Sequence, residues 1–227
     1  MPTPQGTLDW TALTDDPDAV APAVADAVRA GAVPTARLAR IDPELSDTAA
    51  FCEAYDVDVQ ATANCVVVQG RRGERVTTAA VLVLAADRAD INTTVRKHLD
   101  ARKVSFADQE ETERRTGMTS GGITPVGLPA DWPVLIDRAV ADAEAVVIGA
   151  GRREAKLLVS GAELAALATG IGAGGTTKVL PPAPRGPLAA VLGLGVRAIL
   201  AALVRGMPVR LEYPGGETRG GAATSAG

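Results

Sequence analysis

Runs of β-branched and aliphatic residues recur on both sides of two short helical segments, and this order limits the folds open to the chain. Before the helices stand Cys65–Gln69 and residues 76–84, joined by a glycine-containing stretch that is typical of a hairpin turn. After the helices come three more candidate strands, residues 133–140, 143–151 and 154–160. Strands grouped in this way favour a mixed α+β architecture. We therefore predict an α+β domain with a mixed, strongly curled, barrel-like sheet and short flanking helices.

Polar residues at helix-capping spacing mark the expected helix boundaries. Candidate N-caps stand before four expected helices: Ser46 or Asp47, Asp90, Asp108 and Ser160. The last two are each followed three residues later by a glutamate, which is the spacing of a capping box. Gly117 is placed to end the helix that Asp108 begins.

The length of 227 residues suits one domain of about 150 residues with extensions. Residues 1–40 are expected to be a helical N-terminal extension, because Val20, Val24 and Val28 repeat every four residues. The main domain is expected over residues 41–170.

The character of the sequence changes after residue 170. Residues 171–187 have the glycine and proline density of a linker, residues 188–206 form a nearly continuous apolar helix, and residues 207–227 are expected to be mostly disordered. Arg197 lies near the centre of the apolar helix, where a charge costs about 2.5 to 3.5 kcal/mol on membrane-insertion scales. We therefore expect this helix to dock on the protein or on a partner, with binding to a membrane surface as the second interpretation.

Residues with chemically reactive side chains are few. Cys52 and Cys65 are expected to be reduced, buried thiols, and with His98 they form no zinc site of any usual spacing, so no metal or cofactor is expected. His98 lies in a basic helical stretch with no nucleophile at a suggestive spacing. The acidic, proline-rich start has no basic residue before Arg29 and therefore no secretory signal, which predicts a cytoplasmic location.

The stretch "TGMTSGGITPVGLP", residues 116–129, is the most informative segment. Gly121 and Gly122 can adopt backbone angles closed to other residues, which would let consecutive N–H groups point into a concavity. Pro125 holds Thr124 extended and stiffens the exit of the loop. Such a loop can present backbone donors to an oxygen, although a plain structural turn is the competing interpretation. Gly127, beyond the proline, is expected to be an ordinary turn glycine.

The order of motifs resembles the YbaK/prolyl-tRNA-synthetase-associated domain, an aminoacyl-tRNA deacylase family. The resemblance covers about residues 40–168, and its specific pieces are "FAD" before a short helix, "TG" at its end, and "GGITPVG". It implies a barrel-like α/β domain that hydrolyses the ester joining a wrong amino acid to the 3′ end of a tRNA. An aminoacyl ester is already reactive, so backbone N–H groups and one positioned water would suffice.

The resemblance also implies the residues of the site. Catalytic positions would be Gly121, Gly122 and Asn64, and substrate-binding positions would be Ile123, Thr124, Pro125, Cys65, Gly149, Gly151 and Arg152. The clustering of charge, independently of the resemblance, suggests tRNA contacts at Arg96, Lys97, Arg102 and Lys103. Two departures from the family pattern stand out. The family lysine at the entry of the strand is replaced by Asn64 or Ala63, depending on the alignment, and the family serine of the second glycine turn is replaced by Gly149.

Charge allows only a small nucleic-acid footprint. The formal net charge is −4, so DNA binding is not expected. Basic residues nevertheless gather in three clusters: Arg96, Lys97, Arg102 and Lys103; Arg114 and Arg115; and Arg152, Arg153 and Lys156. Such clusters are more often solvated faces than binding patches, but contact with only the tip of a tRNA tolerates an acidic remainder.

Three functions follow as hypotheses. The first is trans-editing hydrolysis of mischarged tRNA, with the tRNA acceptor end as partner and an aminoacyl-tRNA synthetase as a second candidate partner. The second is a noncatalytic module that binds aminoacyl-tRNA or a nucleotide and has lost turnover with the family lysine. The third is a partner-binding regulator acting through the apolar segment 188–204.

Overall fold

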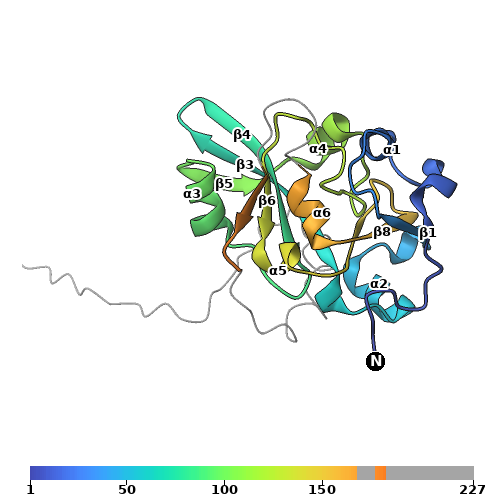
Figure 1. Cartoon of the computed structure of the whole chain (residues 1–227). Coiled ribbons are helices and arrows are strands. Elements are labelled where there is room, and N and C mark those ends of the chain that lie inside the picture. Colours follow the sequence, from blue (N-terminus) through green and yellow to red (C-terminus); the bar gives the residue numbers. More distant parts are fainter. Residues whose placement is uncertain (168–176, 183–227) are drawn as a thin grey trace, which may run out of the picture. The chain divides into compact units, whose positions relative to one another are not determined.

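A computed structural model of the chain describes residues 1–167 and 177–182, and it shows an α+β fold with two sheets and short helices (Figure 1). The expected apolar helix at 188–206 and the tail at 207–227 lie outside the described residues. Within the segment expected to be a linker, residues 177–180 form a strand instead. Among the described residues, no helix is both long and apolar enough to cross a membrane.

The strands divide between two sheets. The antiparallel sheet has the order β1-β2-β8-β7, formed by Thr11–Ala12, Arg37–Arg40, Ala155–Val159 and Val146–Gly149. The mixed sheet has the order β5-β3-β4-β6-β9, formed by Lys103–Phe106, Ala63–Arg72, Arg75–Leu84, Val134–Asp137 and Thr177–Leu180. In the mixed sheet β6 runs parallel to both β4 and β9, and the other pairs are antiparallel.

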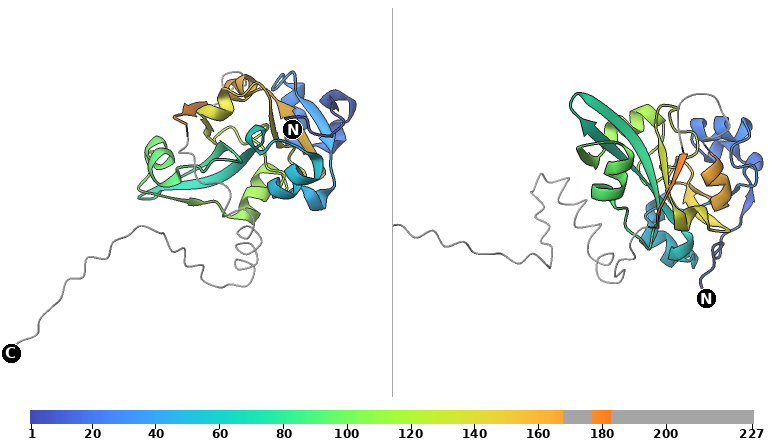
Figure 2. Two further views of the ribbon diagram at one scale, coloured as in Figure 1. Left: turned by 90° about the horizontal axis from the view of Figure 1, so that it is seen from below. Right: turned by 60° about the vertical axis from the view of Figure 1, so that its left-hand side comes forward.

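The predicted single, strongly curled sheet is wrong, although the α+β class is confirmed. A single parallel bridge between Thr62 and Val147 joins the two sheets, and no further strand pairing continues it within the described residues. The cause is β2, which pairs with β8 over four residues and completes a separate sheet around the β7–β8 hairpin. Residues 1–40 thus contribute strands to the same compact unit, in addition to the expected helix. The views in Figure 2 show the long β3–β4 hairpin on one side of this unit and the N-terminal elements on the other.

The helices are short. They are α1 (Pro22–Arg29), α2 (Thr48–Tyr55), α3 (Arg96–His98), α4 (Gln109–Thr116), α5 (Arg138–Ala141) and α6 (Gly161–Ala166). Single 3₁₀ turns occupy Leu13–Asp15, Pro17–Ala19, Pro43–Leu45 and Val59–Ala61, and a π turn at Ile91–Val95 precedes α3.

Side-chain caps begin three of the six α-helices in the described residues, α4, α5 and α6, whereas Asp47 precedes α2 without a side-chain cap bond. The Asp108 carboxylate accepts the Glu111 N–H at 2.9 Å, Ser160 forms a full capping box with Glu163, and Gly117 ends α4 with φ of +66°. These predictions are confirmed. The strand expected over residues 133–140 ends early, because Asp137 accepts the Ala139 N–H at 2.8 Å and starts α5.

Three groups of buried side chains hold the unit together. The first core joins both sheets with α1 and α6, through residues such as Val24, Leu82, Ile136, Ile148, Leu157 and Leu164. The second core covers the opposite face of the mixed sheet with Val68, Val81, Val95, Leu99 and Leu135. The third core surrounds Phe51 of α2 with Trp10, Val147 and Leu158. The central strands β4 and β6 of the mixed sheet are therefore covered on both faces.

Candidate active site

The two glycine-rich turns pack against each other backbone to backbone. The Gly151 N–H donates to the Gly122 carbonyl at 2.7 Å, and the Thr119 N–H donates to the Gly151 carbonyl at 2.9 Å. A Cβ atom placed on Gly149 would lie 2.3 Å from the Gly122 oxygen. The structure thus brings together the two turns that the resemblance assigned to one pocket, and only glycine permits so close an approach.

The two neighbouring glycines of the loop differ in what their N–H groups do. Gly121 is exposed, has φ of +89°, and within the described residues its N–H has no hydrogen-bond acceptor. Gly122 is buried, and its N–H donates to the Thr119 carbonyl at 2.9 Å. Of the two glycine N–H groups, only that of Gly121 is without an acceptor among the described residues. The catalytic role assigned to Gly122 stays a prediction and would require its turn to open.

The exit of the loop is fully enclosed. Thr124, Pro125 and Val126 are buried, and the Thr124 hydroxyl has no hydrogen-bond partner among the described residues. Ile123 packs against the first core. Of the three substrate-binding candidates, Thr124 and Pro125 are therefore buried, and Ile123 is half-buried.

The segment Ser46–Thr48 connects Asn64 with the loop. The Thr48 hydroxyl donates to Asn64 Oδ1 at 2.8 Å, and the Ser46 Oγ lies 3.2 Å from the position of a Cβ on Gly121. Ser46 is 2% exposed and its hydroxyl has no partner among the described residues. Asn64 is exposed at the start of β3, and its amide NH2 group remains able to donate.

Cys65 faces away from Asn64. Successive side chains of a strand point to opposite faces, and Cys65 packs against the first core. Burial raises the pKa of the Cys65 thiol to about 12, so the thiol stays neutral and is a poor nucleophile at neutral pH. Both Cys65 and Cys52 are free cysteines, as predicted.

Arg153 and Lys156 belong to a basic cluster that the sequence analysis interpreted as more typical of a solvated face. The Arg153 guanidinium donates to the Pro43 carbonyl at 3.0 Å and to the Ser120 carbonyl at 3.4 Å, and it lies against Gly121, where a Cβ would be 2.6 Å from Nη1. Arg152, the predicted substrate-binding residue, points elsewhere, since its Nε donates to the Val20 carbonyl at 2.9 Å. Arg153 is therefore the positive charge next to the exposed turn.

Lys156 is buried next to the segment Ser46–Thr48. Its Nζ donates to the Ser46 carbonyl at 2.8 Å and lies 5.2 Å from the centre of the Phe51 ring. Burial, with a smaller contribution from the nearby Arg153 charge, lowers the pKa of the Lys156 amine from 10.5 to about 8. A lysine inside the apolar run "AKLLV" was the sequence signal for this burial, and the cluster interpretation missed it.

The predicted tRNA contacts lie on another part of the unit. Arg96 and Lys97 are exposed on α3, and Arg102 and Lys103 are exposed at the start of β5. No hydrogen bond or ion pair within the described residues joins these four to the glycine turns. His98 is also exposed on α3.

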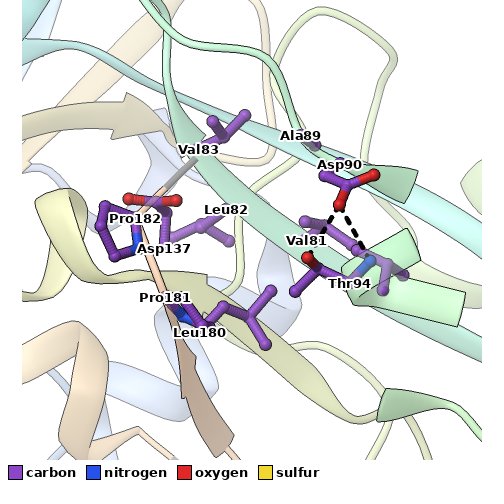
Figure 3. Close-up of a pocket in the computed structure, with 11 residues that line it drawn as sticks. Val81, Leu82, Val83, Ala89, Asp90, Thr94, Asp137, Leu180, Pro181 and Pro182 are labelled. Atoms are coloured by element: carbon purple, nitrogen blue, oxygen red, sulfur yellow. Dashed lines mark hydrogen bonds between the residues drawn. The ribbon is translucent and has the colours of Figure 1, made fainter. Parts of the chain in front are cut away.

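A small cavity between β4, β6 and the Ala89–Val95 segment is shown in Figure 3. Its volume of about 30 Å³ suits a water molecule but not a nucleoside. Its two carboxylates already serve the backbone, because Asp90 accepts from the Thr93 and Thr94 N–H groups and Asp137 caps α5. We therefore place the candidate site at the glycine turns.

The candidate site therefore consists of two apposed glycine turns, a Gly121 N–H without an acceptor among the described residues, and the neighbouring Arg153 cation. The sequence profile of the aminoacyl-tRNA editing domain family matches residues 42–167. This is more than half of the chain, which belongs to that family. The predicted resemblance is confirmed.

Solved structures share the fold. One, described as a proposed trans-editing enzyme for prolyl-tRNA synthetase, has a TM-score of 0.55 and 20% identity over 71% of this chain and 98% of its own. Another, the hypothetical protein APE2540, has a TM-score of 0.54 and 23% identity over 64% of this chain and 90% of its own. At these identities the likeness concerns the fold alone.

Proposed function

We propose that the protein is a trans-editing hydrolase that cleaves the ester of mischarged aminoacyl-tRNA at the tRNA 3′ end. The proposal rests on one observation at an exposed turn with positive φ. The Gly121 N–H has no acceptor among the described residues, and the Arg153 guanidinium lies beside Gly121. Together they can hold the ester carbonyl and the negative charge that develops on its oxygen.

The chemistry then needs only one water. The water oxygen bonds to the carbonyl carbon, the carbon–oxygen bond to the ribose breaks, and the ribose oxygen leaves as a hydroxyl with one proton of the water. The other water proton is released when the carboxyl group of the amino acid ionises. One backbone donor of this kind contributes about 2.7 to 4 kcal/mol in other hydrolases. The neutral Cys65 thiol supports a mechanism without a covalent intermediate. The Asn64 amide would orient the ribose or the amino acid beside the carbonyl.

A panel experiment tests this function directly. The purified protein is incubated with a set of aminoacyl-tRNAs, and loss of the ester is followed over time against the uncatalysed rate. Acceleration on at least one mischarged member is expected. Equal rates with and without protein on every member would refute the hydrolase.

Arg153 is expected to contribute through its charge. Arg153→Gln keeps a donor toward the Pro43 carbonyl but removes the cation, so the single-turnover rate constant should fall about tenfold to hundredfold, the range of a hydrogen bond to a charged group. Arg153→Lys should retain part of the rate. Melting temperatures of both variants separate catalysis from folding. A full rate in the glutamine variant with unchanged melting would show that the charge plays no part.

The second candidate function is a noncatalytic binding module, favoured by the absence of the family lysine, whose position is taken by Asn64 or Ala63. Asn64→Lys distinguishes the two functions because the position is exposed and accepts a longer side chain. If the natural protein hydrolyses, the variant should change its rate by no more than a few-fold. A variant that hydrolyses while the natural protein only binds aminoacyl-tRNA would establish the binding module instead.

A further inference from the structure

The chain has two phenylalanines with opposite environments. Phe51 is fully buried in the third core, whereas Phe106, at the end of the edge strand β5, is 68% exposed. Leaving a phenylalanine in water forgoes about 1.5 to 3 kcal/mol of burial. In the "FAD" motif, Asp108 is explained by its cap on α4 and Ala107 by its N–H bond to the Val67 carbonyl at 2.9 Å. The exposed aromatic ring is the part of the motif that the fold does not use.

Strand register places Phe106 on the same face of the mixed sheet as Asn64. Phe106 pairs with Val68 of the antiparallel neighbour β3, and directly paired residues project to one side. Asn64 stands four residues before Val68, so the period of two puts it on that side as well. Four residues span about 13 Å of strand, or about four stacked nucleotides at 3.4 Å each.

Cations without acidic partners accompany this ring. Arg96, Lys97, Arg102 and Lys103 are exposed and form no ion pair within the described residues. By contrast, Arg72 and Arg75 at the hairpin are both paired with Asp100, at 2.6 Å and 3.1 Å. Although the protein has a net negative charge, these four cations on and near α3 and β5 have no ion-pair partner among the described residues, and Phe106 lies on β5.

An isolated ring among cations suits a nucleobase better than an apolar protein surface. The other large hydrophobic residues that are exposed in the described part of the chain are Met1 and Val76. Val76 pairs with Arg71, which stands an odd number of residues from Asn64, so it projects from the other face. Single-stranded nucleic acid is recognised by aromatic platforms flanked by basic side chains.

We propose that Phe106 is a stacking platform for an unpaired base of the tRNA acceptor end, upstream of the terminal adenosine, with Arg102 on a neighbouring phosphate. The inference rests on the proposed function for the identity of the ligand. The proposed stacking contact would position the single-stranded 3′ end of the tRNA between the basic cluster and Asn64.

The test compares two uncharged tRNA transcripts, one with its unpaired 3′ nucleotides and one without them. Phe106→Ala should weaken binding of the intact transcript about tenfold to hundredfold and leave binding of the shortened one unchanged. Phe106→Trp should bind the intact transcript as the natural protein does. Val76→Ala, an exposed residue on the opposite face, is the matched control and should bind both transcripts normally.

Each other outcome overturns a stated idea. Unchanged binding in Phe106→Ala, or equal weakening on both transcripts, overturns the stacking platform. Full binding by Phe106→Leu would also overturn it, because an aliphatic contact would then suffice. If Phe106→Ala weakens binding as expected but the natural protein hydrolyses no aminoacyl-tRNA, the hydrolase fails and the platform stands.

Discussion

Gly122→Ala is expected to lower the free energy of unfolding by about 3 kcal/mol, the upper part of the range for overpacking. The added Cβ would lie 2.3 Å from the Arg152 carbonyl oxygen and 2.8 Å from the Arg152 nitrogen. These are backbone atoms, so no side-chain rotation can relieve the contact. The two glycine turns would have to separate, and the 2.7 Å bond from the Gly151 N–H to the Gly122 carbonyl would be lost. Urea denaturation with an unchanged m value measures the effect.

Gly73→Ala is the matched control for this prediction. Gly73 is at the tip of the β3–β4 hairpin with φ of +59°, and a Cβ there meets nothing within 4 Å. Its replacement should cost about 1 kcal/mol from backbone strain alone. If Gly122→Ala cost no more than Gly73→Ala, the close packing of the turns would be wrong. The sequence alone predicted a larger effect on turnover than on folding, because it could not show that Gly122 is buried.

The same contact geometry revises the expectation for Gly127. Sequence favoured an ordinary turn glycine, but Gly127 has φ of +80° and a Cβ there would lie 2.4 Å from the Ala23 carbonyl oxygen of α1. The contact joins residues that are about one hundred positions apart. Only the folded chain reveals it.

Local features were predictable because their chemistry is local. The Asp108 cap, the Ser160 capping box and the Gly117 helix end each involve residues within a few positions of one another. The sheet division was not predictable, because it depends on long-range pairing. The short strand Arg37–Arg40 lies in the expected N-terminal extension, yet it pairs with both β1 and β8. Thr177–Leu180 lies among glycines and prolines, yet it forms an edge of the mixed sheet.

The candidate site was likewise predictable in part. The family resemblance indicated that the two glycine turns belong together, and the described geometry places them together. Which N–H group is available could not be predicted, because it depends on the turn bond from Gly122 to Thr119. The positions of Arg153 and Lys156 could not be separated either, because charge clustering in sequence ignores that Arg153 lies in the turn before β8 whereas Lys156 is buried within β8.

Lys156 gives the second large effect, a pH-dependent stability. Its pKa is about 8 in the folded protein and 10.5 ordinarily, a difference worth about 3 kcal/mol. Below pH 8 both folded and unfolded chains hold the proton, and the fold carries the whole cost of the buried charge. Between pH 8 and 10.5 the unfolded chain binds more protons, so the contribution of Lys156 to stability rises with pH.

The measurement is the free energy of unfolding of the natural protein minus that of Lys156→Met, followed from pH 7 to 10.5. Subtraction removes other groups, including Cys65, whose raised pKa lowers stability as pH rises above 9. The difference should rise by about 3 kcal/mol. Lys156→Arg, which stays charged throughout, should show no such rise relative to Lys156→Met. Parallel curves for the natural protein and Lys156→Met would mean that the amine beneath Ser46 is solvated, and that the packing around Phe51 is looser than the structure has it.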